Sequence, residues 1–509
     1  MRTNIKSILA AALLTTMVAG CAKIGDFGDI NLSPNSPSQP NTAMLFTYAS
    51  LYPRNFVMTS VSYDPWPAFY AGYLAECKNN QYGGLTTTVD FNTAGYYLYC
   101  MKHLNEIVRL ASDPETNTES YVAEFGSLDN QIAIATTYKC FIMMTLTDIL
   151  GPLPYSEAFK GESDDIWTPK FDSQQDIYTA LNQELEAAYA KFDMDGEING
   201  KYDIFYGGDI EKWKKFNATV RMLMAIKLSD VDPSTGKTRF AKAFADGGLE
   251  EGDDFCFTFS QTTNAWLYDV GNLDYAQRNL MFTVSDTFVE ALKEYKDPRL
   301  FTYCDLNGYL GAREGDPKDF NAYKGVTLGL PGNPDVLAMA GAACSVAQKY
   351  CEKTATYGLI TAARALLVEA EAAQRGWISA SASSLYEAGI AASFAFTDAD
   401  GLDAYIAAHP LPSDGAEAIK EIVMQRFLDG FMTDHIEVWA DWRRTNVPER
   451  PSTAHQVSEN GHNCYPYRMQ YYDTDKTSNK AQYDACISTF FGGNDDRWNR
   501  LWWDTEDNE

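Results

Sequence analysis

The sequence has few of the residues, and none of the short motifs, on which most enzyme classes depend. It contains only five histidines in 509 residues, and it has no H-E-x-x-H pair, no C-x-x-C pair and no G-x-S-x-G elbow. It therefore offers no recognisable zinc site and no recognisable serine-hydrolase nucleophile. Two partial matches each lack a required residue: Gly236-Lys237-Thr238 for a P-loop, and Asp193-x-Asp195-Gly196 for a calcium loop. We interpret the first as a chance match and the second as an acidic turn.

Basic residues are also scarce. The chain has 41 Lys and Arg against 69 Asp and Glu, which gives a formal net charge of −28. Such a charge repels phosphate backbones and argues against nucleic-acid binding. The ten cysteines form no metal-binding spacing. A chain of this length does not need disulfides for stability, so we expect mostly buried free thiols.

Long apolar runs are missing, and the one short run lies near the N-terminus. Residues 8–14 (ILAAALL) follow Arg2 and Lys6 and precede Val18-Ala19-Gly20-Cys21. The run is too short for a bilayer, which needs about 20 apolar residues. A basic start, an apolar middle and small residues before a cysteine resemble a bacterial lipobox. We therefore predict a signal peptide at 1–20 and a lipid on Cys21; the alternative is an ordinary signal with a chance cysteine. Ala22, in place of an aspartate, fits outer-membrane sorting.

The rest of the chain predicts a tether followed by one large, mainly α-helical domain. Residues 21–41 are rich in Gly, Ser, Pro, Asn and Asp and read as a lipidated flexible tether. From residue 42 to residue 509 we see no composition break that would divide the chain. Apolar periodicity predicts helices at 98–112, 121–150, 174–191, 211–229, 284–295, 356–375, 382–395 and 415–433. Strand signals are few, with the clearest at 255–259, and long irregular loops lie between the helices.

Aromatic residues are the one compositional excess, with 31 Tyr, 27 Phe and 10 Trp. Most must be core residues, but two groups lie in polar loops among amide and charged side chains. Such a mixture is typical of concave binding sites, where rings stack and polar groups orient the ligand. The alternative is that the rings anchor the loops to the helical body. The candidate ligand-binding residues are Asn79, Asn80, Gln81, Tyr82, Tyr96, Asn264, Trp266, Tyr268, Asp269 and Arg278.

Several motifs, read together and in order, resemble the SusD/RagB-like outer-membrane lipoproteins of Bacteroidota. Together they span residues 145–504. The motifs are Leu146–Ala158 (LTDILGPLPYSEA), Tyr206–Asp209 with Trp213–Asn217 and Asp230–Pro233, Asp297–Leu300, Glu369–Trp377, Trp439–Thr445 with Pro448, and Gly492–Asp495 with Trp502–Asp504. One departure is Asn446, which stands where a glycine is common.

The resemblance implies a fold and a function. The fold would be a mainly α body with tetratricopeptide-like helix pairs, long irregular loops and a few short strands. The protein would bind a nutrient, most often a glycan, without cleaving it and without a cofactor or metal. It would hand the ligand to a SusC-like TonB-dependent barrel transporter, from a lipid-anchored position on the outer membrane that faces the exterior.

The motif residues themselves read as structural, and three other functions stay open. Asp441, Arg443 and Arg444 lie beside Trp439 and Trp442, and arginines among carboxylates and rings usually lock a fold. The first alternative function is a lipid-anchored glycoside hydrolase, which would need two carboxylates in one cleft. The second is a helical-repeat scaffold that binds only its protein partner. The third is a peptide-binding member of the same family.

Overall fold

The computed structural model describes residues 41–52, 66–76, 92–259, 282–306, 318–328, 343–351, 354–449 and 465–505. The predicted signal peptide, Cys21 and the tether up to residue 40 lie outside these ranges. Within them the chain is built from helices, with three two-stranded antiparallel sheets. The prediction of a mainly α fold with a few short strands is confirmed.

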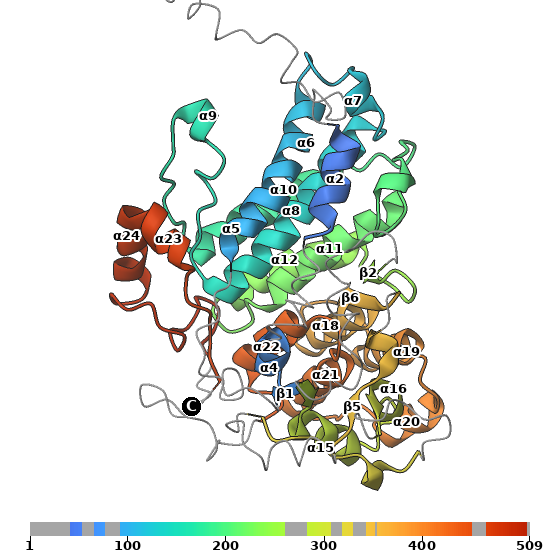
Figure 1. Cartoon of the computed structure of the whole chain (residues 1–509). Helices are drawn as coiled ribbons and strands as arrows, with labels where there is room; N and C mark the ends of the chain where they lie inside the picture. The colour runs from blue at the N-terminus through green and yellow to red at the C-terminus, as the bar shows by residue number, and fades with distance from the viewer. Residues whose placement is uncertain are drawn as a thin grey trace, which may run out of the picture.

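Long helices pack side by side in the half of the molecule at the top of Figure 1. They pair as α6 with α8, α8 with α10, and α11 with α12. Their bounds are α2 Thr42–Ser50, α6 Lys102–Ser112, α8 Leu128–Leu150, α10 Gln174–Lys191, α11 Ile210–Ile226 and α12 Pro233–Asp246. Several begin at a capping side chain that accepts a backbone N–H: Ser173 for α10, Asp209 for α11 and Asp232 for α12.

Helix α8 is the centre of this half. By length and composition it is the one described helix that could cross a membrane, but 83% of its apolar window is buried inside the structure. It ends at Leu150, where Gly151 has a φ of +88°, as the Leu-Gly-Pro sequence predicts. We therefore assign α8 to the core.

The second half of the molecule is organised around α18, which packs against α19 and α21. One hydrophobic cluster runs through both halves and includes Leu146 of α8, Trp213 of α11 and Trp439 of α22. The helices of this half are α4 Trp66–Ala71, α15 Asp286–Glu294, α16 Leu300–Tyr303, α18 Ala362–Gln374, α19 Ala382–Thr397, α20 Leu402–Ala408, α21 Gly415–Asp429 and α22 His435–Thr445. The remaining helices of the chain are α5 Thr93–Tyr96, η2 Tyr97–Met101, α7 Ser120–Ala123, α9 Gly161–Asp164, η3 Gly200–Tyr202, η4 Phe320–Ala322, η5 Gln348–Cys351, α23 Asp473–Ser478 and α24 Lys480–Phe490, within the described residues.

Three predicted helix boundaries were wrong. The segment 356–375 begins as strand β6 (Thr356–Ile360), which pairs with β2 (Phe255–Thr258), and only then becomes α18. The run Thr-Tyr-Gly-Leu-Ile suits a strand because β-branched and aromatic residues pack well on a pleated surface. The segment 121–150 is divided at Gly126, whose φ is +117°. The segment 415–433 ends at Asp429, and α22 follows as a separate helix.

Helix α12 was not predicted, and it contains the P-loop-like sequence. A Cβ added at Gly236 would lie 2.8 Å from Trp377 Cη2 and 2.9 Å from the Ala225 carbonyl oxygen. The glycine is therefore required by close helix packing, and Gly236-Lys237-Thr238 lies inside a helix rather than in a phosphate loop. The Asp193–Gly196 segment is a turn whose carbonyls at 193 and 196 accept from Asn130 Nδ2, at 2.8 and 2.7 Å.

The described cysteines agree with the expectation of free thiols. Six are free, and all of them except the half-buried Cys256 are buried. They are Cys100, Cys140, Cys256, Cys304, Cys344 and Cys486.

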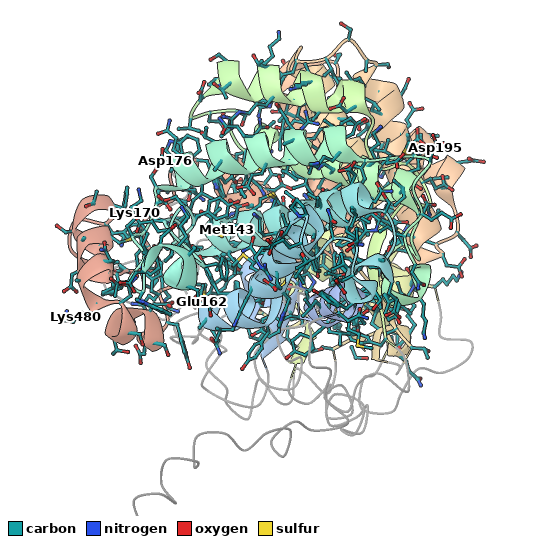
Figure 2. The ribbon with its side chains drawn as sticks, turned by 90° about the horizontal axis from the view of Figure 1, so that it is seen from above. Met143, Glu162, Lys170, Asp176, Asp195 and Lys480 are labelled. Carbon is teal, nitrogen blue, oxygen red and sulfur yellow. The ribbon has the colours of Figure 1, made fainter. Side chains whose placement is uncertain are left out.

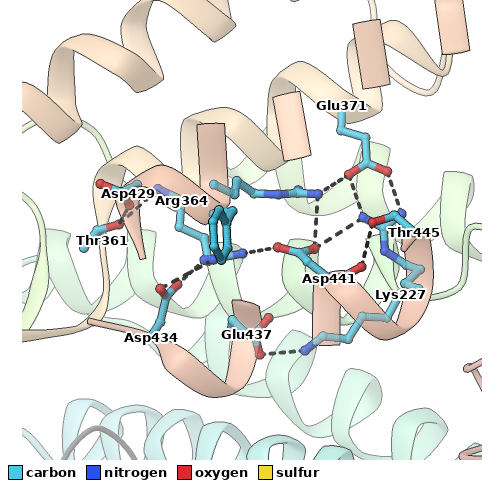
Figure 3. Close-up of polar contacts among 12 residues, drawn as sticks. Lys227, Thr361, Arg364, Glu371, Asp429, Asp434, Glu437, Asp441 and Thr445 are labelled. Carbon is cyan, nitrogen blue, oxygen red and sulfur yellow. Dashed lines mark hydrogen bonds and ion pairs between the residues drawn. The ribbon is translucent and has the colours of Figure 1, made fainter. Parts of the chain in front are cut away.

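A buried network of charged side chains joins α18, α21 and α22 (Figure 3). Glu371 of α18 accepts from Arg444 Nη1 and Nη2, both at 2.7 Å, and from Arg426 Nη2 at 2.6 Å. Asp441 of α22 pairs with Arg364 Nη1 at 2.5 Å and with Arg426 Nη2 at 3.1 Å. Burial alone would raise the pKa of Glu371, but the arginines around it outweigh that effect and hold the pKa well below its usual range.

A second buried group fastens the two halves together. Lys227, directly after α11, donates to Asp148 of α8 at 2.7 Å and to Glu437 of α22 at 2.6 Å. Asp148 also accepts from Tyr178 and from Trp503 Nε1, the latter at 2.9 Å. Residues more than 300 positions apart therefore meet at one carboxylate.

Replacing Glu371 by Gln should destabilise the protein by about 3–5 kcal/mol, because it leaves buried arginines without a counter-charge. Urea denaturation followed by circular dichroism measures the effect. Glu417→Gln is the matched control, because Glu417 pairs with Lys420 at 3.0 Å while both side chains are exposed. Equal stability of the two variants would show that the network is not required.

Candidate functional site

The two predicted ligand clusters are attached to the framework at the same sheet edge. Strand β1 (Leu74–Glu76) pairs antiparallel with β3 (Phe282–Val284), and Glu76 lies opposite Phe282. The first cluster begins three residues after Glu76, and the second ends four residues before Phe282. Residues 79–82, 264, 266, 268, 269 and 278 lie outside the described residues. In this antiparallel register, the chain leaves β1 toward the first cluster and enters β3 from the second cluster at the same end of the sheet.

Buried polar side chains secure the opposite end of this sheet, where Leu74 pairs with Val284. Ser285, directly after β3, donates through its hydroxyl to the Gly72 carbonyl at 2.5 Å and caps α15 by accepting from Phe288 N at 3.2 Å. Tyr73, before β1, donates its hydroxyl to the Phe427 carbonyl at 2.6 Å. The two-stranded sheet is thus fixed to α15 and α21 rather than standing alone.

Tyr96 is the one predicted ligand residue within the described part of the chain. It closes α5, which Asn92 caps by accepting from Gly95 N at 3.1 Å. The Tyr96 side chain is buried and packs edge-on against the Tyr52 ring at 4.8 Å between centroids. Tyr96 is therefore part of the hydrophobic core rather than of an exposed surface.

The exposed aromatic groups beside Tyr96 were not predicted. Tyr99 and Leu98 of the π-helix η2 are 46% and 53% exposed, and Tyr48 of α2 is 50% exposed. The Tyr99 ring packs on Tyr52 at 5.6 Å between centroids, so it is held in place on the surface. No periodicity in the sequence marks these residues, because the π-helical turn changes which side chains face outward.

Comparisons with known proteins agree on one family. A family model described as SusD-like, "Starch-binding associating with outer membrane", matches residues 34–472. This chain belongs to the SusD-like family. The family is associated with the outer membrane and with nutrient binding.

Solved structures of similar fold cover both chains almost completely. A chitin-binding protein is 26% identical with a TM-score of 0.75, and the match covers 92% of this chain and 100% of that one. A chitin-binding SusD homolog from Flavobacterium johnsoniae is 23% identical with a TM-score of 0.71, covering 92% and 97%. A SusD homolog from Bacteroides fragilis NCTC 9343 is 22% identical with a TM-score of 0.70, covering 91% and 99%. No curated protein sequence matches this chain.

The SusD-like motif residues are structural in this protein, as their chemistry predicted. The Arg443 guanidinium lies 3.8 Å from the Trp439 ring centroid and donates to the carbonyls of Asp148 and Tyr467, both at 2.8 Å. Arg444 makes the bidentate pair with Glu371. Asn446 has a φ of +53°, so it ends α22 in the left-handed region that asparagine tolerates better than most residues. The departure from glycine at this position therefore preserves the turn.

Glu369 is a buried carboxylic acid whose pKa is raised toward neutral pH. Burial raises the pKa of Glu369 to about 8, with a smaller contribution from Glu250. The side chain lies beneath the turn at Gly248, where an added Cβ would come 2.6 Å from Glu369 Oε1. A general acid needs access to a substrate, and Glu369 is packed under backbone, so its environment indicates a packing role.

The contribution of Glu369 to stability should fall as the pH rises from about 4.5 to about 8. In the unfolded chain the carboxyl loses its proton near the ordinary glutamate pKa of 4.5, whereas in the folded chain it keeps the proton up to about pH 8. The folded state thus binds more protons across this interval, and stability decreases with pH. Glu369→Gln mimics the protonated form and should flatten this part of the profile. Denaturation midpoints at pH 5, 7 and 9 check it, with Glu387→Gln on the exposed face of α19 as the control; parallel profiles for wild type and Glu369→Gln would contradict it.

Proposed function

We propose that this SusD-like protein captures a glycan through the two clusters around residues 79–82 and 264–278. The observation that supports the proposal is the β1–β3 register: the chain leaves β1 toward residues 79–82 and enters β3 from residues 264–278 at the same end of the sheet. Each cluster mixes tyrosine or tryptophan with amide side chains, and rings that stack on a sugar while amides bind its hydroxyls are a common basis of recognition. The protein acts by binding rather than by cleavage.

Chitin and starch fragments are the first ligands to test. Two of the similar structures are described as chitin-binding, and the family model is described as starch-binding. Calorimetry of the purified protein against chitin, starch and other plant and microbial oligosaccharides, with peptides in parallel, tests the class of ligand. Saturable binding of at least one glycan is expected. Binding of peptides alone would favour the peptide-binding alternative, and new reducing ends would favour the hydrolase.

Trp266→Ala should weaken binding of the glycan found in that panel by about tenfold, or ~1.4 kcal/mol. The physical reason is the loss of a flat stacking surface. The midpoint of thermal unfolding should stay nearly unchanged, because a ligand platform is not part of the core. Trp167→Ala is the control, since Trp167 is exposed and lies outside both clusters. A large loss of stability in Trp266→Ala would instead identify a core anchor.

We further propose that the protein hands its ligand to a SusC-like TonB-dependent transporter while a lipid on Cys21 holds it to the outer membrane. The sequence Val18-Ala19-Gly20-Cys21 and the polar tether after it support this arrangement. The tether would let the helical body move relative to the barrel while remaining attached. Co-purification of a barrel transporter from the native membrane tests the partnership; a barrel partner without any small ligand would favour the scaffold alternative.

Cys21→Ala should release the protein from membranes without changing its fold, because the cysteine is the only predicted attachment point. Fractionation of cells followed by carbonate extraction measures the distribution, and circular dichroism checks the fold. Cys256→Ala serves as a control for the loss of a thiol. Persistence of Cys21→Ala in the membrane as an integral protein would refute the anchor.

A further inference from the structure

A pocket is formed beside helices α23 and α24. Figure 1 shows these helices at one side of the molecule, apart from β1. The pocket has a volume of about 490 Å³ and opens between α23, α24 and the turn at residues 492–495. Its polar lining comes from Gln470, Lys476, Asp484, Ser488, Asn494 and Asp495. We propose that this pocket binds a neutral sugar residue of a glycan. The inference rests on the proposed glycan binding and adds a site to it.

The inner wall of the pocket is held rigidly by Asp495. Its carboxylate accepts from Arg468 Nη1 at 2.5 Å, from Tyr471 N at 3.2 Å and from Tyr483 Oη at 3.2 Å. Arg468 is itself buried and lies 4.2 Å from the Phe491 ring centroid. Gln470 Nε2 donates to the Asp495 carbonyl at 2.6 Å, which fixes the lining amide. A ligand would therefore meet groups that are already in place, which reduces the ordering cost of binding.

Each charged residue that lines the pocket has a partner of opposite charge. Asp484 pairs with Lys480 at 2.7 Å, and Lys476 lies 3.3 Å from Asp473 and 3.9 Å from Asp495. What remains for a ligand is hydrogen bonding rather than uncompensated charge, which favours a neutral partner. The net charge of −28 on the chain acts in the same direction, because it disfavours anionic sugars.

The other lining residues provide an aromatic ring, an apolar contact and a hydroxyl, which are groups that contact sugar rings in binding sites. Tyr483 contributes a half-buried ring, and its edge-on contact with Tyr471 at 6.0 Å fixes the orientation. Ser488 contributes a hydroxyl and Ile487 an apolar contact. At Gly493 an added Cβ would meet no atom within 4 Å, so the peptide backbone faces open space and can be approached closely. The volume falls within the usual range for small-molecule sites.

The pocket is formed by the C-terminal segment of the chain, and this segment is contacted by residues 169–171, which are far away in the sequence. Asn479, just before α24, donates through Nδ2 to the Pro169 carbonyl at 2.7 Å, and Phe171 packs edge-on against Tyr471 at 5.4 Å. Figure 2 shows Lys480 and Lys170 at this end of the molecule. The same corner includes the Gly492–Asp495 motif, which the structural network around Glu371 does not use.

The proposal is tested by measuring the NMR signal of an Ile487 methyl group in the pocket. In the mature protein with labelled isoleucine methyls, the Ile487 signal is assigned with Ile487→Val and monitored by NMR during titration. The probes are N,N′-diacetylchitobiose and maltose as neutral sugars, and glucuronic acid as an anionic one. At least one neutral probe should shift the Ile487 signal saturably, whereas glucuronic acid at the same concentration should not. Ser488→Trp should weaken the effect at least tenfold by filling the pocket.

Two variants separate this inference from the proposed function. Thr489→Trp places the same bulk on the next residue of α24, which does not line the pocket, and should leave the Ile487 shift unchanged. Trp266→Ala should leave it unchanged as well. An Ile487 signal that no neutral probe moves, while calorimetry still detects Trp266-dependent binding, overturns the pocket and leaves the proposed function standing. An equal response to glucuronic acid, or an unchanged response in Ser488→Trp, also overturns it.

Discussion

The structure depends on keeping buried charges paired. Glu371, Asp441 and the arginines of α18, α21 and α22 are enclosed in the core, where an unpaired charge costs several kcal/mol. Glu371 and Asp441 each pair with two or more arginines, so any other packing of these helices would leave buried charges without a partner. Lys227 forms buried ion pairs of the same kind between the two halves, because it contacts Asp148 of α8 and Glu437 of α22. Hydrophobic burial supplies most of the stabilisation, and the charges select the geometry.

This arrangement divides the chain into a frame and its attachments. The motif residues lie in the frame: Asp148, Glu371 and Arg444 each hold two or more elements. The β1–β3 sheet is fixed to that frame through Tyr73 and Ser285, and it carries the segments with the predicted ligand clusters. A rigid frame that presents variable loops can change its ligand without changing its fold. This separation explains why the family motifs identify the architecture but not the ligand.

The sequence predicted well where local chemistry decides the structure. Gly151 ends α8 with a positive φ, as the Leu-Gly-Pro sequence predicts, and the strand at 255–258 lies within the predicted run. It predicted poorly where tertiary contacts decide. Helix α22 is buried on almost every side, and its own buried residues include charged and aromatic ones. Its sequence therefore does not alternate between an apolar and a polar face, which is the pattern that predicts a helix. The strand at 356–360 reads as the start of a helix, because a short apolar run does not distinguish the two without its partner β2.

The same limit applies to the binding surfaces. Tyr96 and Tyr99 are three residues apart and chemically identical, yet the first is buried and the second is 46% exposed, because the π-helical turn rotates one inward and the other outward. The pocket at α24 combines residues from 470 to 495 whose proximity depends on Asp495 gathering Arg468, Tyr471 and Tyr483.

A common chemistry nevertheless links that pocket to the two sequence-derived clusters. In the pocket, each charged lining residue has a partner of opposite charge, and the other lining groups are amides, a hydroxyl, a ring and an aliphatic side chain. The clusters likewise place tyrosine and tryptophan beside asparagine and glutamine, and they add Asp269 and Arg278. The negative charge of the chain disfavours anionic ligands, and the charges of the core are used in closing the fold, so both features fit the proposed binding of uncharged, hydroxyl-rich molecules.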